Sequence, residues 1–319
     1  MKRLYISMYH YVRDLQNSRY PQIKGLDLSL FRQQIAFFKE NFHPVTIEEV
    51  IAAYDQQAEL PDKALLLTFD DGYIDHYNAV FPILQENGIQ GSFFIPGKTF
   101  TENVLLDVNK IHFILASADV AELYDDLLLR IDKLIADHEY DAMSKEELIS
   151  KYAVANRFDP KEVIFIKRIL QTVLPEQIRK QISSELFARY VGIPEDKFAR
   201  ELYMNLDQIK CLKRNGMYIG LHGYDHYWMG NLDKAAMEAD IDKSLEVLDD
   251  VVDKDSFIMN YPYGSYNDDV LAYLRKKGCK LGMSTEVRIA DPDKDDRLLL
   301  PRLDCNDFPP KSDKYLKML

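Results

Sequence analysis

The 319-residue chain has little cysteine, little histidine and no long apolar segment. Its three cysteines, Cys211, Cys279 and Cys305, are scattered and form no Cys-x-x-Cys pattern. This indicates a reducing compartment and no disulfide framework. No run of about 18 or more apolar residues occurs, so the sequence predicts no membrane-spanning helix. The fold must therefore rely on a packed core.

The sequence also predicts neither a basic surface nor a secretory leader. The net charge is −12 and no tract is rich in lysine or arginine, which argues against nucleic acid as a partner. The apolar stretch after Lys2 and Arg3 is short and is interrupted by His10 and Arg13, unlike a signal peptide. We expect a cytoplasmic protein, or one bound peripherally at the inner face of the membrane.

The sequence does contain a regular alternation of buried strands and amphipathic helices. Hydrophobic residues make up 47% of the chain and charged residues 29%, values typical of a globular protein. Because helical patterns separate the strands, the sheet should be parallel. The expected fold class is α/β, a distorted (β/α) barrel with parallel strands. The predicted strands are "LYISMYHYV", "KALLLTFDDG", "IQGSFFIPG", "MYIGLHG", "SFIMNYPYG" and "KLGMST".

The alternation is interrupted in the middle of the chain. From about residue 104 to residue 198 the patterns are helical, and the alternation resumes near Asn205. We therefore predict a barrel formed by residues 1–103 and 205–319, with a helical insertion at 104–204. Because the break follows the strand "FFIPG", we expect the inserted helices to lie near the mouth of the functional cleft.

The first chemical motif is "TFDDG" at residues 68–72, where two carboxylates follow a buried strand. In parallel α/β folds the carboxyl ends of the strands carry the active site. Two adjacent carboxylates repel each other, and a bound cation would remove the conflict: one aspartate ligates it and the other stays free as a base. The plain alternative is an Asp-Gly turn.

The second motif is "LHGYDH" at residues 221–226, again just after a predicted strand. His222 and His226 are four residues apart, so on a helical turn both imidazoles would face the same way, as metal ligands do. One aspartate and two histidines would leave coordination positions open for water and substrate. An unrelated pair of histidines is the alternative.

The third motif is "NYPYG" at residues 260–264, where Pro262 and Gly264 force a tight loop. Such a loop can direct a backbone N–H into a site, as an oxyanion hole requires. An ordinary turn with packed tyrosines remains equally open from this motif alone.

Together the three motifs resemble the polysaccharide deacetylases, carbohydrate esterase family four, over most of residues 1–103 and 205–308. The resemblance implies a distorted (β/α) barrel and a divalent metal ion, with zinc expected. It implies Asp71, His222 and His226 as metal ligands and Asp70 as the general base. The backbone N–H of Tyr263 would donate to the oxyanion.

The chain departs from the usual family motifs at three places. Gly223 stands where the family usually has serine or threonine, and Asn260 stands where it has the arginine that orients the base. In addition, no histidine follows His226, although the family's last motif supplies a histidine as general acid. In a standard member, the last departure would predict an inactive enzyme.

A circularly permuted arrangement accounts for the missing acid. The stretch "MYHYV" resembles the N-terminal motif of the poly-N-acetylglucosamine deacetylases, which makes His10 the candidate acid. His76, just beyond "FDDG", is its one serious competitor. Arg302 in "LLLPRLDCND" is a candidate for the missing arginine, and a plain salt bridge is the alternative role.

The function implied by the resemblance is metal-dependent N-deacetylation of an N-acetylated sugar, in a glycan, a lipid-linked glycan or a glycan precursor. Two alternatives stay open: a non-catalytic glycan-binding or assembly protein, and an amidohydrolase acting on a non-sugar acyl amide. The intact set of Asp70, Asp71, His222 and His226 favours an enzyme, because a binding module has no need to keep it.

Overall fold

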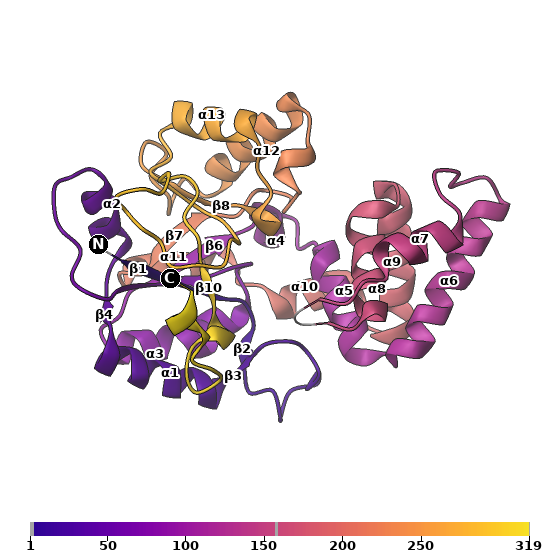
Figure 1. The fold of residues 1–319 in the computed structure, drawn as a ribbon, viewed down its shortest axis with the longest axis horizontal. Coiled ribbons are helices and arrows are strands. Elements are labelled where there is room, and N and C mark those ends of the chain that lie inside the picture. The colour runs from indigo at the N-terminus through magenta and orange to yellow at the C-terminus, as the bar shows by residue number, and fades with distance from the viewer. Residues whose placement is uncertain (1–2, 157–158, 319) are drawn as a thin grey trace. The chain divides into compact units, whose positions relative to one another are not determined.

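A computed structural model describes residues 3–156 and 159–318, and the chain divides into two compact units (Figure 1). The first unit contains Met1–Asp14, Gly25–Val104 and Ala199–Leu319. The second contains Leu105–Phe198 together with Leu15–Lys24, a short segment that the sequence analysis did not assign to the helical part. Each unit is described by itself.

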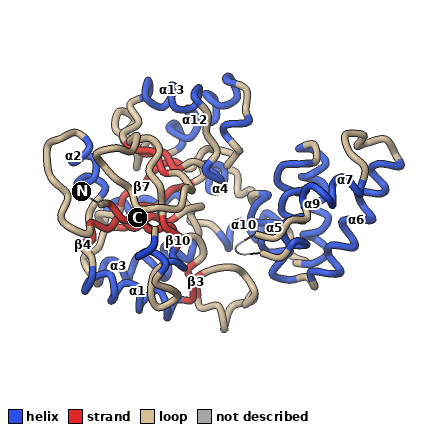
Figure 2. The backbone as a smooth tube through the Cα atoms, in the orientation of Figure 1, coloured by secondary structure: helices blue, strands red, loops and turns tan. Residues whose placement is uncertain are grey.

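The first unit is built on one parallel sheet, drawn in red in Figure 2, with helices around it. The order of its strands is β10-β1-β5-β6-β7-β8-β9, and β4 pairs with β5. This confirms the predicted α/β class with parallel strands, and each of the six predicted strands is present. The strands are β1 (Leu4–Tyr9), β4 (His43–Pro44), β5 (Ala64–Phe69), β6 (Gly91–Ile95), β7 (Tyr218–Leu221), β8 (Ile258–Asn260), β9 (Leu281–Met283) and β10 (Leu303–Asp304); β2 (Val12–Arg13) and β3 (Leu26–Asp27) form a separate pair.

The barrel is drawn together by a short C-terminal segment that reaches both edges of the sheet. Leu300 forms a parallel bridge with Met283 of β9, and Leu303 pairs with Ser7 of β1. Residues 300–304, which include β10, therefore connect β9 with β1. Only β1 separates this segment from β5 in the sheet, so an inward-facing side chain on it can reach the end of β5.

The two faces of the strands belong to different apolar clusters, because successive side chains point to opposite sides of a strand. In β5, Leu65, Leu67 and Phe69 pack in a cluster that includes residues of the surrounding helices. Leu66 packs in a smaller cluster with Leu4, Ile6 and Ile258 from other strands and with Leu300. This smaller cluster fills the inside of the barrel.

Helices of the first unit begin where the sequence supplies a cap. Asp27 accepts a hydrogen bond from the backbone N–H of Ser29, and Thr46 with Glu49 forms a capping box. The helices are α1 (Leu28–Asn41), α2 (Ile47–Tyr54), α3 (Phe81–Glu86), α4 (Gly97–Thr101), α11 (Leu206–Arg214), α12 (Lys234–Val247) and α13 (Asp268–Lys277). One π-helical turn, η1 (His76–Val80), directly precedes α3.

The second unit is helical. Its helices are α5 (Asp107–Ser117), α6 (Val120–Ala136), α7 (Lys145–Tyr152), α8 (Lys161–Arg168), the π-helical turn η2 (Ile169–Val173) and α9 (Glu176–Tyr190), while α10 (Glu195–Leu202) is divided between the two units. An aromatic group of Tyr20, Phe113, Phe187 and Phe198 ties the short segment 15–24 to these helices.

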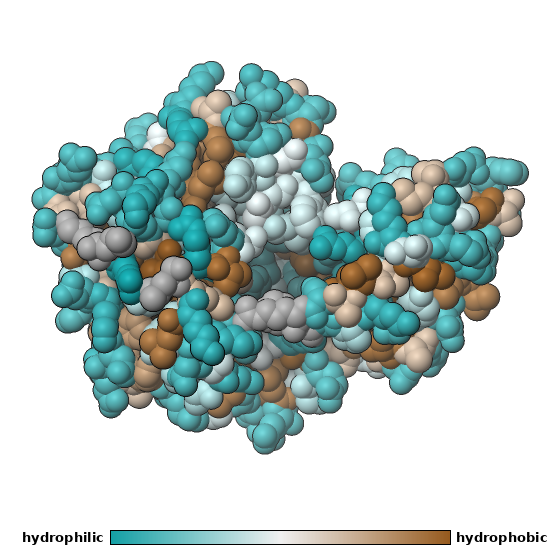
Figure 3. Space-filling view, in the orientation of Figure 1, coloured by the Kyte–Doolittle hydropathy of each residue, from teal (hydrophilic) through white to brown (hydrophobic). Residues whose placement is uncertain are grey.

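The described surface agrees with a chain that buries its apolar residues. The face drawn in Figure 3 is mostly hydrophilic on both units, with small scattered hydrophobic areas. Within residues 3–156 and 159–318, no helix combines the length and the apolar character needed to cross a bilayer.

Candidate active site

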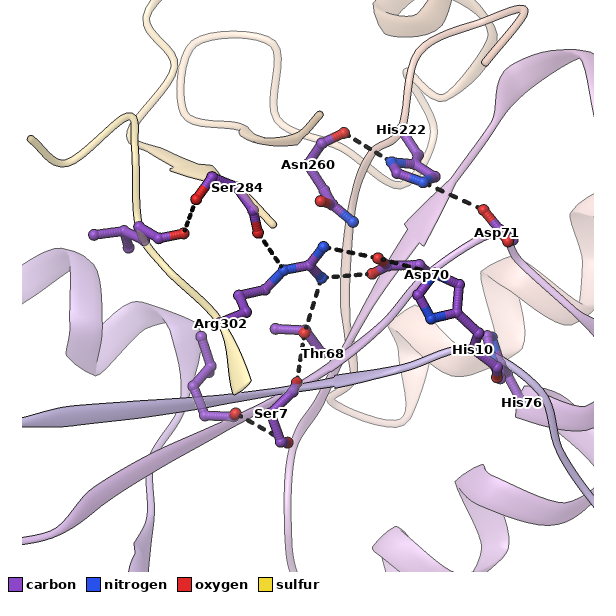
Figure 4. Close-up of polar contacts among 12 residues, drawn as sticks. Ser7, His10, Thr68, Asp70, Asp71, His76, His222, Asn260, Ser284 and Arg302 are labelled. Atoms are coloured by element: carbon purple, nitrogen blue, oxygen red, sulfur yellow. Dashed lines mark hydrogen bonds and ion pairs between the residues drawn. The ribbon is translucent and has the colours of Figure 1, made fainter. Parts of the chain in front are cut away.

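Several side chains of the candidate site lie at or next to strand ends, and they continue the alternation of strand positions that face the inside of the barrel. Leu4 and Ile6 are inward-facing, and the same alternation leads to His10; Leu66 likewise leads to Asp70. The alternation also carries His222, Asn260 and Arg302 inward from Tyr218, Ile258 and Leu300, respectively. Because all these strands are parallel, their carboxyl ends meet at one end of the barrel (Figure 4).

Asp71, His222 and His226 converge on one point. Their candidate ligand atoms all lie within 4.8 Å of one another, and all three residues are buried. The Nε2 atoms of both histidines lie 3.3 Å from the same oxygen, Oδ1 of Asp71. This oxygen accepts no hydrogen bond from any residue that the structure describes. Three unshared donor atoms around one point are the arrangement of a metal site with open positions.

The spacing of the two histidines had suggested a helical turn. In the structure they converge through a loop instead. Gly223 has a φ of +70° and His226 a φ of +57°, so the chain between them is not helical. In His222, Nδ1 lies 2.7 Å from the carbonyl oxygen of Asn260, to which it donates as N–H. That hydrogen bond leaves Nε2 of His222 free to ligate.

The protonation states also suit a divalent metal ion. Burial lowers the pKa of His226, so its imidazole is neutral near neutral pH, as a ligand must be. Burial alone would raise the pKa of Asp71, but the adjacent imidazoles of His222 and His226 outweigh burial and hold this pKa well below its ordinary value. One carboxylate and two imidazoles are a donor set that zinc and similar ions accept.

Asp70 is not one of the clustered candidate ligands and is paired with Arg302. The guanidinium Nη1 and Nη2 atoms donate to Oδ1 and Oδ2 of Asp70 over 2.8 and 2.9 Å (Figure 4). Both side chains are buried, at 1% and 2% exposure. Burial by itself would raise the pKa of Asp70, but Arg302 outweighs it and lowers this pKa to about 2. Asp70 is therefore an ionised carboxylate near neutral pH.

Arg302 is held in place by contacts on its other side. Its Nε donates to the carbonyl oxygen of Ser284 over 3.0 Å, and Nη1 also donates to Oγ1 of Thr68 over 3.2 Å. The sequence analysis left open a replacement for the arginine missing at Asn260 or a plain salt bridge. The arginine enters from residues 300–304 and faces Asp70 (Figure 4).

His10 lies beside Asp70, and 40% of its side chain is exposed. Its Nε2 is 3.8 Å from Oδ2 of Asp70. The strand register accounts for this proximity: Tyr9 pairs with Phe69, and the N–H of Asp70 donates to the carbonyl of Tyr9. His10 is accessible to a substrate, unlike a histidine of the core.

His76, the competitor of His10, is fully buried among aromatic rings. Its Nε2 lies 2.8 Å from the carbonyl oxygen of His10, to which it donates. Burial lowers the pKa of His76 to about 4, so the ring is neutral near neutral pH. A neutral buried ring whose N–H is bonded to the backbone cannot hand a proton to a substrate; instead it supports His10.

The loop after β8 brings Tyr263 next to His226, one of the candidate metal ligands. Tyr263 has a φ of +58°, and its ring centroid lies 4.8 Å from that of His226 and 4.3 Å from that of Trp228. Asn260, at the end of β8, is fully buried, and its side-chain amide has no hydrogen-bond partner among the described residues. The backbone of this loop thus lies at the same end of the barrel as the carboxylates.

The sequence analysis missed two residues that contact this site. The hydroxyl of Tyr73 donates to Oδ2 of Asp71 over 2.5 Å, which leaves Oδ1 directed toward the histidines. Its position, immediately after "TFDDG", was the available signal. The second residue, Asp240 on α12, contacts the loop between His222 and His226, and nothing in its sequence surroundings marks it.

Comparisons with known proteins agree with this arrangement. The family model "Polysaccharide deacetylase" matches residues 57–146 and 193–282, together more than half of the chain. The chain is 48% identical over 58 residues to the poly-beta-1,6-N-acetyl-D-glucosamine N-deacetylase of Escherichia coli K12; this match covers 18% of the chain and 9% of that protein.

Two solved structures share the fold. Streptococcus pyogenes deacetylase PplD, in complex with acetate, aligns with 99% of this chain and 97% of its own, at a TM-score of 0.59 and 18% identity. IcaB from Ammonifex degensii aligns with 100% and 97%, at a TM-score of 0.57 and 18% identity.

The fold and the matched segments define the class: this is a parallel (β/α) barrel of the deacetylase type. The chain belongs to the polysaccharide deacetylase family, as its motifs indicated. Members of this family are metal-dependent deacetylases.

Proposed function

We propose that this protein is a metal-dependent N-deacetylase that removes the acetyl group from an N-acetylated sugar of a glycan. The observation that carries the proposal is the pairing of Asp70 with Arg302 directly beside the Asp71, His222 and His226 cluster. This arrangement would provide a fixed, ionised base next to a metal site. Family membership and the short match to a sugar deacetylase support the same chemistry.

Asp71, His222 and His226 would hold the metal ion, with zinc expected from the donor set. When bound, a divalent ion supplies a Lewis acid for the amide carbonyl and lowers the pKa of water. Tyr73 would orient Asp71 through its hydroxyl, and the carbonyl of Asn260 would orient His222.

Asp70 would act as the general base. Arg302 keeps it ionised and fixes the plane of its carboxylate through two parallel hydrogen bonds. A carboxylate has about four lone-pair sites, so it can still accept a proton from the attacking water while both oxygens are bonded to Arg302. As the water oxygen bonds to the acetyl carbon, its proton passes to Asp70.

His10 would be the general acid. The C–N bond cannot break easily to release an amide anion, so the nitrogen must receive a proton as it leaves. His10 lies beside Asp70 and is accessible, and its Nε2 would supply that proton. The backbone N–H of Tyr263 would donate to the oxygen that gains negative charge. The products are acetate and a free amino sugar.

The test is acetate release from defined N-acetylglucosamine oligosaccharides, with β-1,6-linked chains compared with β-1,4-linked ones. Protein loaded with zinc should release acetate and free amine in equal amounts. Asp70→Asn should keep its zinc and lose turnover by about 10²–10⁴-fold, the usual contribution of general acid–base catalysis. Asp141→Asn, at an exposed position of the helical unit, serves as the control.

Two results would contradict the proposal, and a third would change the roles of residues within it. Zinc-loaded protein that binds the oligosaccharides without releasing acetate would favour the non-catalytic alternative. Release of acetate from small acyl amides but from no sugar would favour the amidohydrolase. Loss of zinc from Asp70→Asn would exchange the roles of the two aspartates.

A further inference from the structure

The loop that carries both histidine ligands has no regular secondary structure to hold it. It leaves β7 after Leu221, and its backbone is left-handed at Gly223 and at His226. In a helical turn, backbone hydrogen bonds would fix the distance between side chains four residues apart. In this loop, other contacts must bring the two imidazoles toward Asp71.

One such contact comes from Asp240 on helix α12. Its Oδ1 accepts a hydrogen bond from the backbone N–H of Tyr224 over 2.9 Å, and its Oδ2 accepts one from the N–H of Asp225, also over 2.9 Å. The two donors are consecutive residues in the middle of the loop. Both oxygens of one carboxylate are therefore used to hold it.

The other side of the loop is held by the start of helix α4. The N–H of Gly97 donates to the carbonyl of Gly223 over 3.0 Å, and the N–H of Lys98 donates to the carbonyl of Tyr224 over 2.9 Å. The N–H groups of the loop face α12 and its carbonyls face α4. The middle of the loop is thus fixed between two helices, and Asp240 is the side chain that provides the acceptors.

Asp240 is a costly residue to place here unless the loop needs it. It is 6% exposed, and burial raises its pKa. Within the described parts of the chain, no lysine or arginine forms an ion pair with it; the nearby Lys98 pairs with Asp225. Its charge is stabilised mainly by the two backbone N–H groups of the loop.

Asp240 also explains why glycine follows the first histidine. At Gly223 the φ of +70° strains any residue with a side chain, and a Cβ there would lie 3.0 Å from Oδ1 of Asp240. The family's usual serine or threonine would press against the carboxylate. The departure at Gly223 and the contact from Asp240 therefore belong together.

We propose that Asp240 is a positioning residue that holds the loop between His222 and His226 so that both Nε2 atoms face Asp71. The inference rests on the metal site of the proposed function. Asp240 is not one of the three candidate ligands; it acts through the backbone N–H groups of Tyr224 and Asp225. Outer contacts of this kind typically change metal affinity by about 10–100-fold.

The first variant is Asp240→Asn. It keeps the shape of the side chain but offers only one acceptor oxygen, so an NH₂ group meets one of the two N–H donors. Zinc affinity, measured by competition with a chromophoric chelator, should fall about 10–100-fold. Hydrogen exchange of the Tyr224 and Asp225 amides should be faster by about tenfold or more. The same increase should be seen in the metal-free protein.

The matched control is Asp242→Asn on the same helix. Asp242 accepts a hydrogen bond from the hydroxyl of Tyr273 and pairs with Lys277, both over 2.8 Å, away from the loop. This change should leave zinc affinity and the two amide exchange rates as in the wild type. The control separates the loss of a carboxylate on α12 from the loss of the contact with the loop.

A second variant, Gly223→Ala, disturbs the same contact from the other side and leaves α12 intact. It should also lose zinc affinity, and it decides the question if Asp240→Asn does not fold. Unchanged zinc affinity in whichever of these variants folds would overturn the role of Asp240. Wild-type protein that takes up no zinc would overturn the proposed function instead, so the two failures are distinguishable.

Discussion

Asp70 and Asp71 are neighbours in the chain, yet their side chains have different partners. Asp70 points inward from the end of β5 and meets Arg302, whereas Asp71, with a φ of +73°, turns toward His222 and His226. The left-handed backbone at Asp71 lets two adjacent carboxylates point in different directions. The repulsion expected between them is relieved by separate partners.

Removing Arg302 should show how much Asp70 depends on it. Arg302→Met leaves a buried carboxylate without its cation, and breaking a buried pair in this way costs about 3–5 kcal/mol. We expect the free energy of unfolding by denaturant to fall by this amount. As a control, Arg275→Met removes the exposed pair with Asp296 and should cost about 0–1 kcal/mol. Equal losses in the two variants would contradict a special role for the Arg302 pair.

Replacing His10 tests the proposed acid. His10→Gln keeps a polar side chain but cannot deliver a proton, so turnover should fall about 10²–10⁴-fold. Zinc content, measured by elemental analysis, should stay at the wild-type level because His10 is not among the candidate ligands. His43→Gln, at an exposed position before Pro44, is the control. A His10→Gln enzyme with full activity would leave the leaving nitrogen without an acid in this site.

At the scale of elements, the site depends on where strands end and on one segment that joins the two edges of the sheet. β1, β5, β7 and β8 end at one side of the barrel, and His10, the two aspartates, the two histidines and the Tyr263 loop follow these ends. Residues 300–304 then add Arg302, which is 232 residues from Asp70 in the chain. The alternation of side chains along the strands directs His10, Asp70 and Arg302 to the inside of the barrel.

The π-helical turn η1 (His76–Val80) stabilises the end of β1 through a contact between His76 and the backbone of His10. His76 donates to the carbonyl of His10 and is packed against Phe69, Tyr73 and Phe93. Burial lowers the pKa of its ring to about 4, with smaller effects from His10, Asp70 and Asp71. In the unfolded chain the same ring has its ordinary pKa of about 6.5.

These values predict a pH dependence of stability. As the pH falls from about 6.5 to about 4, the unfolded chain binds a proton at His76 that the folded chain does not bind. The free energy of unfolding should therefore decrease across this window, by up to about 3 kcal/mol from this group. His76→Gln keeps an N–H donor but cannot titrate. The free energy of unfolding of this variant should therefore change less than that of the wild type between about pH 7 and about pH 4.5, near the two ends of the window.

The control for this measurement is His138→Gln. His138 is 84% exposed, so its replacement should leave the pH dependence as in the wild type. If His76→Gln lost stability with falling pH as steeply as the wild type, the acid sensitivity would have to come from other groups.

At the scale of the whole molecule, a metal ion would join distant parts of the chain. Its ligands lie at the end of β5 and after β7, about 150 residues apart in sequence, with the helical unit of Leu105–Phe198 between them. A ligand that binds only the folded state stabilises it by mass action.

Zinc at about 100 times its Kd should raise the free energy of unfolding by about 2.7 kcal/mol. The melting temperature of wild-type protein should rise on adding zinc to the metal-free form and fall again on adding a chelator. His222→Ala should show no such rise, because one of three ligands is gone. An equal rise in both proteins would place the ion elsewhere.

Much of the barrel could be predicted from local sequence. A strand such as "ALLLTF" is apolar throughout, and helices are marked by caps such as Thr46 with Glu49. These signals lie within a few residues of the elements they define, so the parallel α/β class and the strands that carry the site follow from them. The candidate residues Asp70, Asp71, His222 and His226 were visible because they follow such strands.

Other features were outside the reach of local sequence, because they depend on residues far apart in the chain. The spacing of His222 and His226 suggested a helical turn, but contacts with α4 and α12 hold a loop instead. The assignment of residues 15–24 to the helical unit depends on packing against Phe113 and Phe198.

The sequence by itself thus determined the class of fold, the family and the chemical types at the site, since each is written in a short motif. Only the tertiary structure decided the partners: Arg302 faces Asp70, His76 supports the backbone of His10 and Asp240 holds the histidine loop. Each of these three contacts joins separate elements. Their geometry is set by the register of the sheet and by the packing of helices against it, which no local pattern specifies.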